Sequence, residues 1–205
     1  MIRFTQETDS AFALMDQRYC IYHGKHEAFS LSETDSAGYV RIDTSAVGPC
    51  IHIPNMDAHK LAVFAEKKCA DHLVFIFDES KQIWGLHIFE LKHTIDSTKW
   101  TRLILHQFNG ALLQARAIAG FLRIDRPLAV SFHCAYQKNK SDPSPAELKQ
   151  LSGKPASLPW TEQSYCLPSF PEISLIPVHD CFFRLKADFS GIMPPLDIPS
   201  DIIIG

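Results

Sequence analysis

The spacing of apolar positions changes along the chain and separates predicted strands from a predicted helix. Two apolar runs, residues 73–77 and 83–91, flank the polar stretch 78–82, which predicts a β-hairpin with its turn at the centre. Residues 39–43 alternate between apolar and polar side chains and predict an earlier strand. A second short strand is expected at 51–53, where Pro54 ends the apolar run.

Beyond the hairpin the apolar period lengthens to three and four residues, which predicts one long amphipathic helix over 97–122. Asp96 or Ser97 is the expected N-cap of this helix. The apolar positions are Trp100, Leu103, Ile104, Phe108, Ala111, Leu112, Ala115, Ala119 and Leu122. Residues 128–135 then predict a buried strand, and 181–186 a final one. This order favours an α/β fold with a central mixed β-sheet flanked by helices.

Other segments carry weaker patterns. Residues 12–17 suggest a short helix, and 61–65 form one more short apolar run. Residues 137–172 lose all periodicity and carry six of the 13 prolines, which indicates a long irregular insertion. We therefore expect a single domain over 1–205, with its core at about 37–135 plus 173–190.

The composition, 46% hydrophobic and 21% charged, is typical of a soluble globular protein. The chain has no apolar run of about 18 residues, so no membrane span is expected. The first residues lack the apolar region of a secretion signal, and the six cysteines are scattered without a C-x-x-C pair. Both features favour a reducing cytoplasm. A net charge of −3 argues against sequence-blind nucleic-acid binding over the whole surface, although it leaves room for a local basic patch.

Three charged residues lie at the open end of the predicted hairpin. If Asp78 pairs with Ile83 across the turn, Asp71 falls opposite Glu90, and directly opposed residues share a face with Cβ atoms about 5 Å apart. Lys92 lies two residues beyond Glu90 and therefore points to the same face. Two carboxylates so close repel each other unless a cation lies between them. A hard divalent ion with oxygen ligands would satisfy the pair.

The same residues resemble the motif of a nuclease superfamily. Asp71 enters one strand, Glu90-Leu91-Lys92 ends the next, and a long helix and another buried strand follow. This arrangement, over residues 67–135, resembles the PD-(D/E)xK nucleases, with Ala70 in place of the proline. Some members carry Q-x-x-x-Y on the following helix, and here only the glutamine, Gln107, matches.

The resemblance implies a restriction-endonuclease-like fold and a metal-dependent hydrolase of phosphodiester bonds, with DNA as the expected substrate. It implies that Asp71 and Glu90 bind Mg²⁺, for which Mn²⁺ can substitute, and that the Leu91 carbonyl is a further ligand. Such an ion polarises the phosphate and lowers the pKa of a bound water. Lys92 would help to activate that water or stabilise the developing negative charge. Many members carry another acid on the first helix, for which Glu27, Glu33 and Asp57 are candidates.

Lys99, Arg102 and Gln107 lie on the predicted helix and are candidates for contact with nucleic acid. The two cations could equally form the solvated face of the helix. Four histidines lie near the expected site in sequence and could transfer protons, namely His72, His87, His93 and His106. A cut through both strands would usually require two active sites, so the sequence leaves a homodimer open.

E-x-K alone is not specific, because it occurs four times here, at 66–68, 79–81, 90–92 and 147–149. Only the occurrence at 90–92 ends a predicted strand opposite an acid. Three alternatives follow. The charged residues could be the solvated ends of an ordinary hairpin, with Glu90 salt-bridged to Lys92. The chain could be a non-catalytic nuclease-fold module for binding or assembly, or a metal-free interaction protein.

A second arrangement of ligand types lies near the N-terminus. Cys20, His23 and His26 recur every third residue and could form half of a zinc site. No matching second half is visible in the sequence, although His179 and Cys181 could contribute in space.

Overall fold

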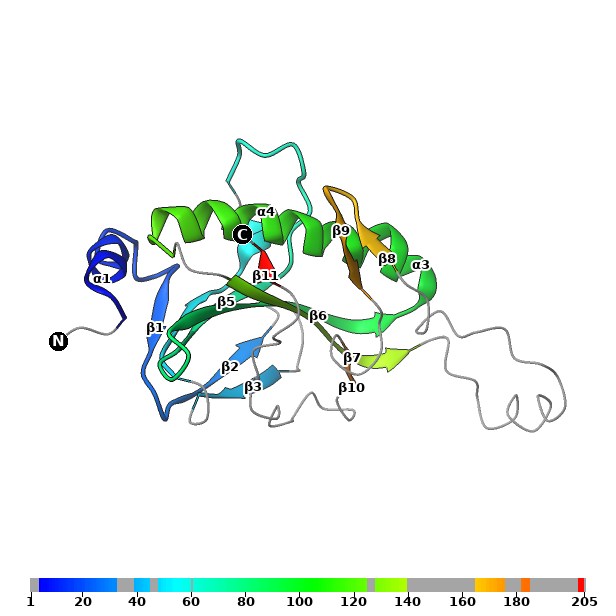
Figure 1. Ribbon diagram of the computed structural model, residues 1–205. Helices are drawn as coiled ribbons and strands as arrows, with labels where there is room; N and C mark the ends of the chain where they lie inside the picture. Colours follow the sequence, from blue (N-terminus) through cyan, green and yellow to red (C-terminus); the bar gives the residue numbers. More distant parts are fainter. Residues whose placement is uncertain are drawn as a thin grey trace, which may run out of the picture.

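The computed structural model describes residues 4–32, 39–44, 48–59, 61–124, 128–139, 165–175, 182–184 and 203–204. Its centre is a mixed β-sheet with the strand order β1-β4-β5-β6-β7, as Figure 1 shows. Neighbouring strands are antiparallel from β1 to β6, and β7 is parallel to β6. Beyond β6, both β10 (parallel) and β11 (antiparallel) pair with β7. The strands are β1 (Ile21–His23), β4 (Cys50–Ile53), β5 (His72–Asp78), β6 (Ile83–Ile95), β7 (Leu128–Asn139), β10 (Phe182–Arg184) and β11 (Ile203–Ile204). The mixed α/β sheet expected from the sequence is confirmed.

One long helix, α4 (Leu105–Phe121), lies across one face of this sheet (Figure 1). The sequence predicts a continuous helix from 97, but the structure divides it into α3 (Ser97–Lys99), a π-helical turn η1 (Trp100–Ile104) and α4. The expected cap is confirmed, because the Asp96 carboxylate accepts a 2.7 Å hydrogen bond from the Lys99 amide. Apolar residues of β5, β6, β7 and α4 form the larger core between the helix and the sheet.

The opposite face of the sheet is covered by a two-stranded hairpin, β2 (Ala28–Ser32) and β3 (Tyr39–Asp43), and not by a helix. Leu31, Val40 and Ile42 of this hairpin are fully buried in a second apolar cluster with residues of β5 and β6. The sequence predicts a sheet flanked by helices; among the described residues α4 covers one face and the β2–β3 hairpin the other. The pattern misleads because a sheet buried on both faces reads as a continuous apolar run, which does not reveal what covers it.

The N-terminal helix differs from its predicted position. The structure has α1 (Gln6–Phe12), whereas the sequence pattern suggested 12–17. Thr5 begins the helix early, because its side-chain oxygen accepts a 3.2 Å hydrogen bond from the Thr8 amide. A second short helix, α2 (Met56–His59), follows β4.

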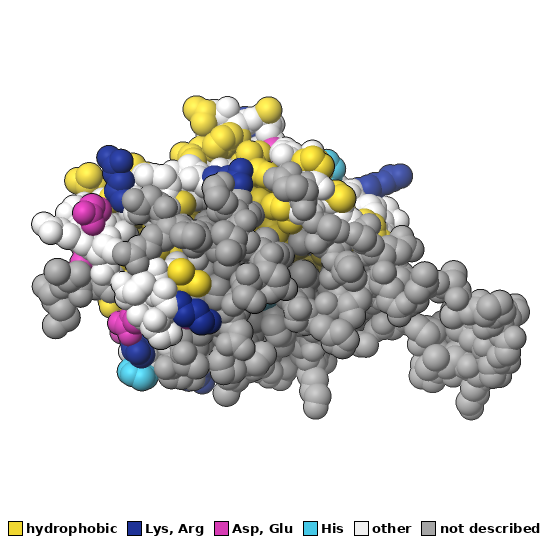
Figure 2. Space-filling model, viewed as in Figure 1, with side chains coloured by type: hydrophobic (Ala, Val, Ile, Leu, Met, Phe, Trp, Pro, Cys, Tyr) yellow, Lys and Arg dark blue, Asp and Glu magenta, His cyan; other side chains and the backbone are white. Residues whose placement is uncertain are grey.

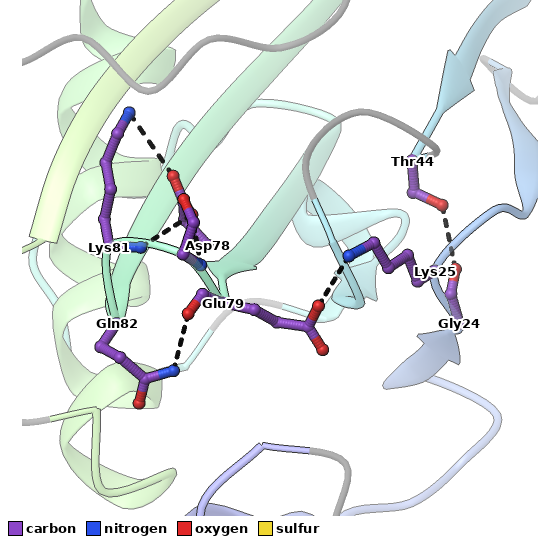
Figure 3. A network of polar contacts seen from close by, with 8 residues as sticks. Gly24, Lys25, Thr44, Asp78, Glu79, Lys81 and Gln82 are labelled. Atoms are coloured by element: carbon purple, nitrogen blue, oxygen red, sulfur yellow. Dashed lines mark hydrogen bonds and ion pairs between the residues drawn. The ribbon is translucent and has the colours of Figure 1, made fainter.

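The hairpin turn between β5 and β6 is held by side chains, as Figure 3 shows. The Asp78 carboxylate accepts hydrogen bonds from the amides of Ser80 (2.9 Å) and Lys81 (3.1 Å). Glu79 forms a 2.8 Å ion pair with Lys25 (Figure 3). Because local bonds define the turn, they also define the register of the strands that leave it.

The predicted insertion, 137–172, is partly regular. Its first residues continue β7 to Asn139, and its end forms β8 (Tyr165–Leu167) and the start of β9 (Phe170–Leu175). The stretch 140–164 lies outside the described residues. The β8–β9 hairpin contacts α4, where the Asn109 side chain accepts a 2.7 Å hydrogen bond from the Ser169 amide. The final strand predicted at 181–186 is confirmed as β10.

Candidate active site

The predicted register of the hairpin is confirmed. Asp78 pairs with Ile83, and the pairing continues without a shift to His72 and Phe89. Asp71 directly precedes His72, and Glu90 directly follows Phe89, the partner of His72. The Glu90 side chain continues the row that faces α4, which consists of Trp84, Leu86 and Ile88.

Asp71 closes the open end of the hairpin with its side chain. Its Oδ2 accepts a 2.8 Å hydrogen bond from the amide of Leu91, between the two charged residues of β6. The Asp71 carbonyl accepts a 2.9 Å bond from the amide of Met56. Since the N–H and C=O of one strand residue point to the same neighbour, the Leu91 carbonyl also faces the side of Asp71. The carboxylate and the carbonyl expected as ligands thus lie at the same edge.

Glu90 is fully buried, and its carboxylate forms an ion pair with the Lys92 ammonium, which is 15% exposed. Burial raises the pKa of Glu90 well above its usual value, and the nearby Asp71 carboxylate raises it further. Lys92 and the Gln107 amide act in the opposite direction. The buried Glu90 carboxylate therefore lies beside a second acid, Asp71, and is held by Lys92 and the Gln107 amide.

Gln107 anchors the segment that leads into Asp71. Its backbone carbonyl accepts a 3.1 Å hydrogen bond from the Ala70 amide, and its side-chain nitrogen donates a 3.4 Å bond to the Cys69 carbonyl. Gln107 is only 8% exposed. These contacts argue against the direct nucleic-acid contact expected from the sequence and instead give Gln107 a positioning role.

Gly110 allows the same segment to lie directly on α4. A Cβ atom added here would overlap the backbone carbonyl of Lys68. We expect Gly110→Ala to lower the free energy of unfolding by about 1 to 3 kcal/mol, because the helix and the segment must move apart. The measurement is denaturant unfolding of the variant beside the wild type.

The matched control is Gly120→Ala on the same helix. A Cβ atom at Gly120 would meet nothing within 4 Å, so alanine should stabilise the helix by about 0.5 to 1 kcal/mol. Equal stability of the Gly110 and Gly120 variants would show that the segment does not depend on this close approach.

The two cations expected to contact nucleic acid differ in their surroundings. The Lys99 ammonium donates to the carbonyl (3.0 Å) and the hydroxyl (2.7 Å) of Thr94, so it joins the end of β6 to α3. Arg102 is exposed on η1, and its carbonyl accepts a 2.7 Å bond from the Lys68 ammonium. Arg102 is therefore the better placed of the two for an external phosphate.

The candidates for the upstream acid separate clearly. Asp57 directly follows Met56, whose amide binds the Asp71 carbonyl, so its backbone neighbours the site. Glu27 lies 3.8 Å from His23 at the other end of the sheet. Glu33 lies outside the described residues.

Of the histidines considered for proton transfer, two face away from Glu90. His72 and His87 are buried on the β2–β3 face, because they alternate with Asp71 and the Glu90 row. His93 is exposed, and His106 lies 3.3 Å from the Glu66 carboxylate.

Sequence reasoning missed a group of buried histidines on the β2–β3 face. His52 Nε2 lies 3.2 Å from His72 Nδ1, and His87 Nδ1 lies 3.0 Å from His133 Nε2. Burial lowers the pKa of His52 to about 2, of His87 to about 3 and of His72 to about 4. The strand alternation could have placed His72 and His87 on one face, but β4 and β7 had no predicted register.

The N-terminal zinc arrangement does not converge. Cys20 is buried in the core on the α4 side, and burial raises its pKa to about 12. His23 instead stacks on Phe29 of the hairpin, 3.8 Å between ring centroids, and His26 follows in a turn. His179 and Cys181 lie outside the described residues.

The Asp71–Glu90 site fits a hard cation by its chemistry. It offers two carboxylates and the Leu91 carbonyl, and oxygen ligands of this kind suit Mg²⁺ or Mn²⁺. Among the described residues no three histidine, cysteine, aspartate or glutamate side chains converge on one point. An ion here would therefore rely on backbone, water or substrate oxygens to complete its coordination.

No family model matches the chain, and no curated protein or solved structure matches it either. Within the described part of the chain, no helix combines the length and apolar character needed to cross a membrane.

Proposed function

We propose that this chain is a metal-dependent nuclease of the PD-(D/E)xK type, with a restriction-endonuclease-like fold and an active site of Asp71, Glu90 and Lys92. The observation that carries the proposal is the fully buried Glu90 carboxylate, which lies beside the partly buried Asp71 carboxylate and is paired with Lys92. Acids whose pKa values are shifted by burial and by a second acid cluster at functional sites. The order β5, β6, α4 and a parallel β7 also supports the proposal, since it repeats the order of the resemblance.

The proposed roles follow from the environment of each residue. Asp71 and Glu90 would hold Mg²⁺ or Mn²⁺ together with the Leu91 carbonyl, and the ion would polarise the scissile phosphate and acidify a water. Asp71 Oδ2 accepts the hydrogen bond from the Leu91 amide, which orients the Asp71 carboxylate at the open end of the hairpin. Lys92, at the partly exposed rim, would orient the attacking water and stabilise negative charge on the phosphoryl oxygens.

The test is a cleavage assay with Mg²⁺ or Mn²⁺ on single- and double-stranded DNA and RNA, linear and circular. The proposal expects divalent-dependent cleavage of DNA, lost in EDTA. Absence of cleavage on every substrate, together with no Mg²⁺ binding by calorimetry, would overturn it.

Lys92→Met provides a sharper test of the division of roles. Because an ammonium cannot ligate a cation, we expect turnover to fall by about 100- to 1,000-fold, while Mg²⁺ affinity is kept or tightens. Single-turnover kinetics and calorimetry measure the two quantities. The matched control is Lys25→Met, which breaks the surface ion pair with Glu79 at the other end of the hairpin and should change neither. An equal loss of turnover and affinity in Lys92→Met would contradict the assigned role.

One observation favours the second candidate, a non-catalytic nuclease-fold module for binding or assembly. The Lys92 ammonium already neutralises Glu90 without a metal. If calorimetry shows no Mg²⁺ binding but the chain still binds nucleic acid, this second function is the correct one.

A further inference from the structure

An apolar loop tip projects from the surface close to the candidate active site. Residues 61–64 (Leu-Ala-Val-Phe) form this tip, which lies above α4 in Figure 1. Val63 is 85% exposed and Leu61 43% exposed. Hydrophobic side chains gather on the same loop in Figure 2. An exposed apolar cluster of this kind marks an interaction surface more often than scattered single residues do.

The tip has a defined shape, held by four hydrogen bonds. The buried Gln114 side chain accepts a 2.8 Å bond from the Leu61 amide, and the Phe64 amide donates a 3.4 Å bond to the Leu61 carbonyl. The Lys67 ammonium donates to the carbonyls of Ala62 (3.1 Å) and Phe64 (2.8 Å). A surface ordered before binding loses less conformational entropy when it binds.

Its surroundings are basic and lead directly to the site. Lys67, Lys68 and Arg102 are exposed, and the Lys68 ammonium donates to the Arg102 carbonyl, whereas Glu66 is half-buried and paired with His106. Gln114, which anchors the tip, lies two helical turns from Gln107, about 10 Å along α4. The chain therefore runs from an apolar tip through two lysines to the Asp71 carboxylate.

We propose that residues 61–64 are an apolar wedge that enters between neighbouring bases of a nucleic acid whose phosphates lie along Lys67, Lys68 and Arg102. This inference rests on the proposed nuclease function. Apolar side chains inserted between base steps unstack and bend nucleic acids, and the flanking cations complement the backbone charge. The wedge would distort the bound strand and favour substrates that bend or unpair easily.

The test uses Val63→Ser in the full chain with DNA that carries 2-aminopurine, whose fluorescence rises when its base unstacks. Binding is measured in EDTA, so that no cleavage occurs. The wild type should raise the fluorescence, and Val63→Ser should weaken binding about tenfold, as expected for losing the burial of one valine side chain. Leu14→Ser is the control, because Leu14 is equally apolar and 77% exposed but lies beside α1; it should behave as the wild type.

The outcomes separate this inference from the proposed function. If the wild type cleaves DNA, and Val63→Ser binds and unstacks DNA as the wild type does, the wedge is overturned and the nuclease proposal stands. If Val63→Ser loses the unstacking, no variant cleaves any substrate and calorimetry shows no Mg²⁺ binding, the wedge is supported and belongs to the non-catalytic binding module instead of a nuclease. If the wild type self-associates, Val63→Ser abolishes this association and DNA shows no fluorescence change, the wedge is overturned. The tip then binds a second copy of the chain.

Discussion

Glu90→Gln should abolish divalent-dependent cleavage, with a fall in turnover of at least about a thousandfold, and should at the same time stabilise the protein without metal. The substitution preserves shape but removes the buried charge. Burial and the neighbouring Asp71 raise the pKa of this carboxyl in the folded state. Because the pKa of Glu90 is raised in the folded state, the stability that its protonated form contributes is fully present below the pKa of the unfolded chain. This stability is lost as the pH rises through the pKa of the folded chain. The charged form of Glu90 is therefore disfavoured in the folded chain, and glutamine cannot take that form.

The size of the stabilisation should be on the order of 1 to 3 kcal/mol, because each unit by which burial and Asp71 raise the pKa of Glu90 against the opposing effect of Lys92 corresponds to about 1.4 kcal/mol. Thermal unfolding with and without Mg²⁺ measures it. The wild type should gain stability from Mg²⁺, because the ion binds the folded state alone, and Glu90→Gln should gain little. Glu79→Gln is the matched control, since Glu79 forms a surface ion pair at the other end of the same hairpin. Mg²⁺ stabilisation of Glu90→Gln equal to that of the wild type would refute the assigned ligand.

The parts of the site that local chemistry determines could be predicted from the sequence. Asp78 binds amides within its own turn, so the turn and hence the register to His72 and Phe89 follow from nearby residues. The same register brings Asp71 next to Glu90. The Asp96 cap is equally local, and it was predicted.

Features that depend on distant contacts could not be predicted. The apolar residues of β5 indicate burial on both faces, but they do not reveal that a β-hairpin covers one face and α4 the other. Gln107 lies on the apolar side of a helix pattern, and only the packing of residues 69–70 against it shows that its amide is occupied. The π-helical turn η1 changes the phase of the helix, and hydrophobic period alone gives no signal for it.

The histidine pairs are a further consequence of long-range register. His52, His72, His87 and His133 come from four neighbouring strands and are at most 5% exposed. Within each pair the two facing ring nitrogens share a hydrogen bond while the rings are neutral, since one nitrogen donates and the other accepts. Protonation of both rings in a pair would place two donors against each other inside the protein. Burial accordingly lowers the pKa of all four.

We therefore expect the protein to unfold in mild acid. A histidine with a lowered pKa contributes stability that is present above its unfolded pKa, about 6.5, and is lost as the pH falls toward its folded pKa. Each histidine then lowers the free energy of unfolding by about 1.4 kcal/mol per pH unit, so four together lower it by more than about 5 kcal/mol per unit. With an ordinary total stability of about 5 to 15 kcal/mol, unfolding should occur between about pH 4 and 5.5.

Circular dichroism against pH measures the midpoint of this unfolding. The double variant His87→Phe with His133→Phe should shift the midpoint to lower pH and make the transition less steep. His93→Gln, at an exposed position, should leave the curve unchanged. A native wild type at pH 3.5, or a double variant with the wild-type curve, would show that these rings do not control acid stability.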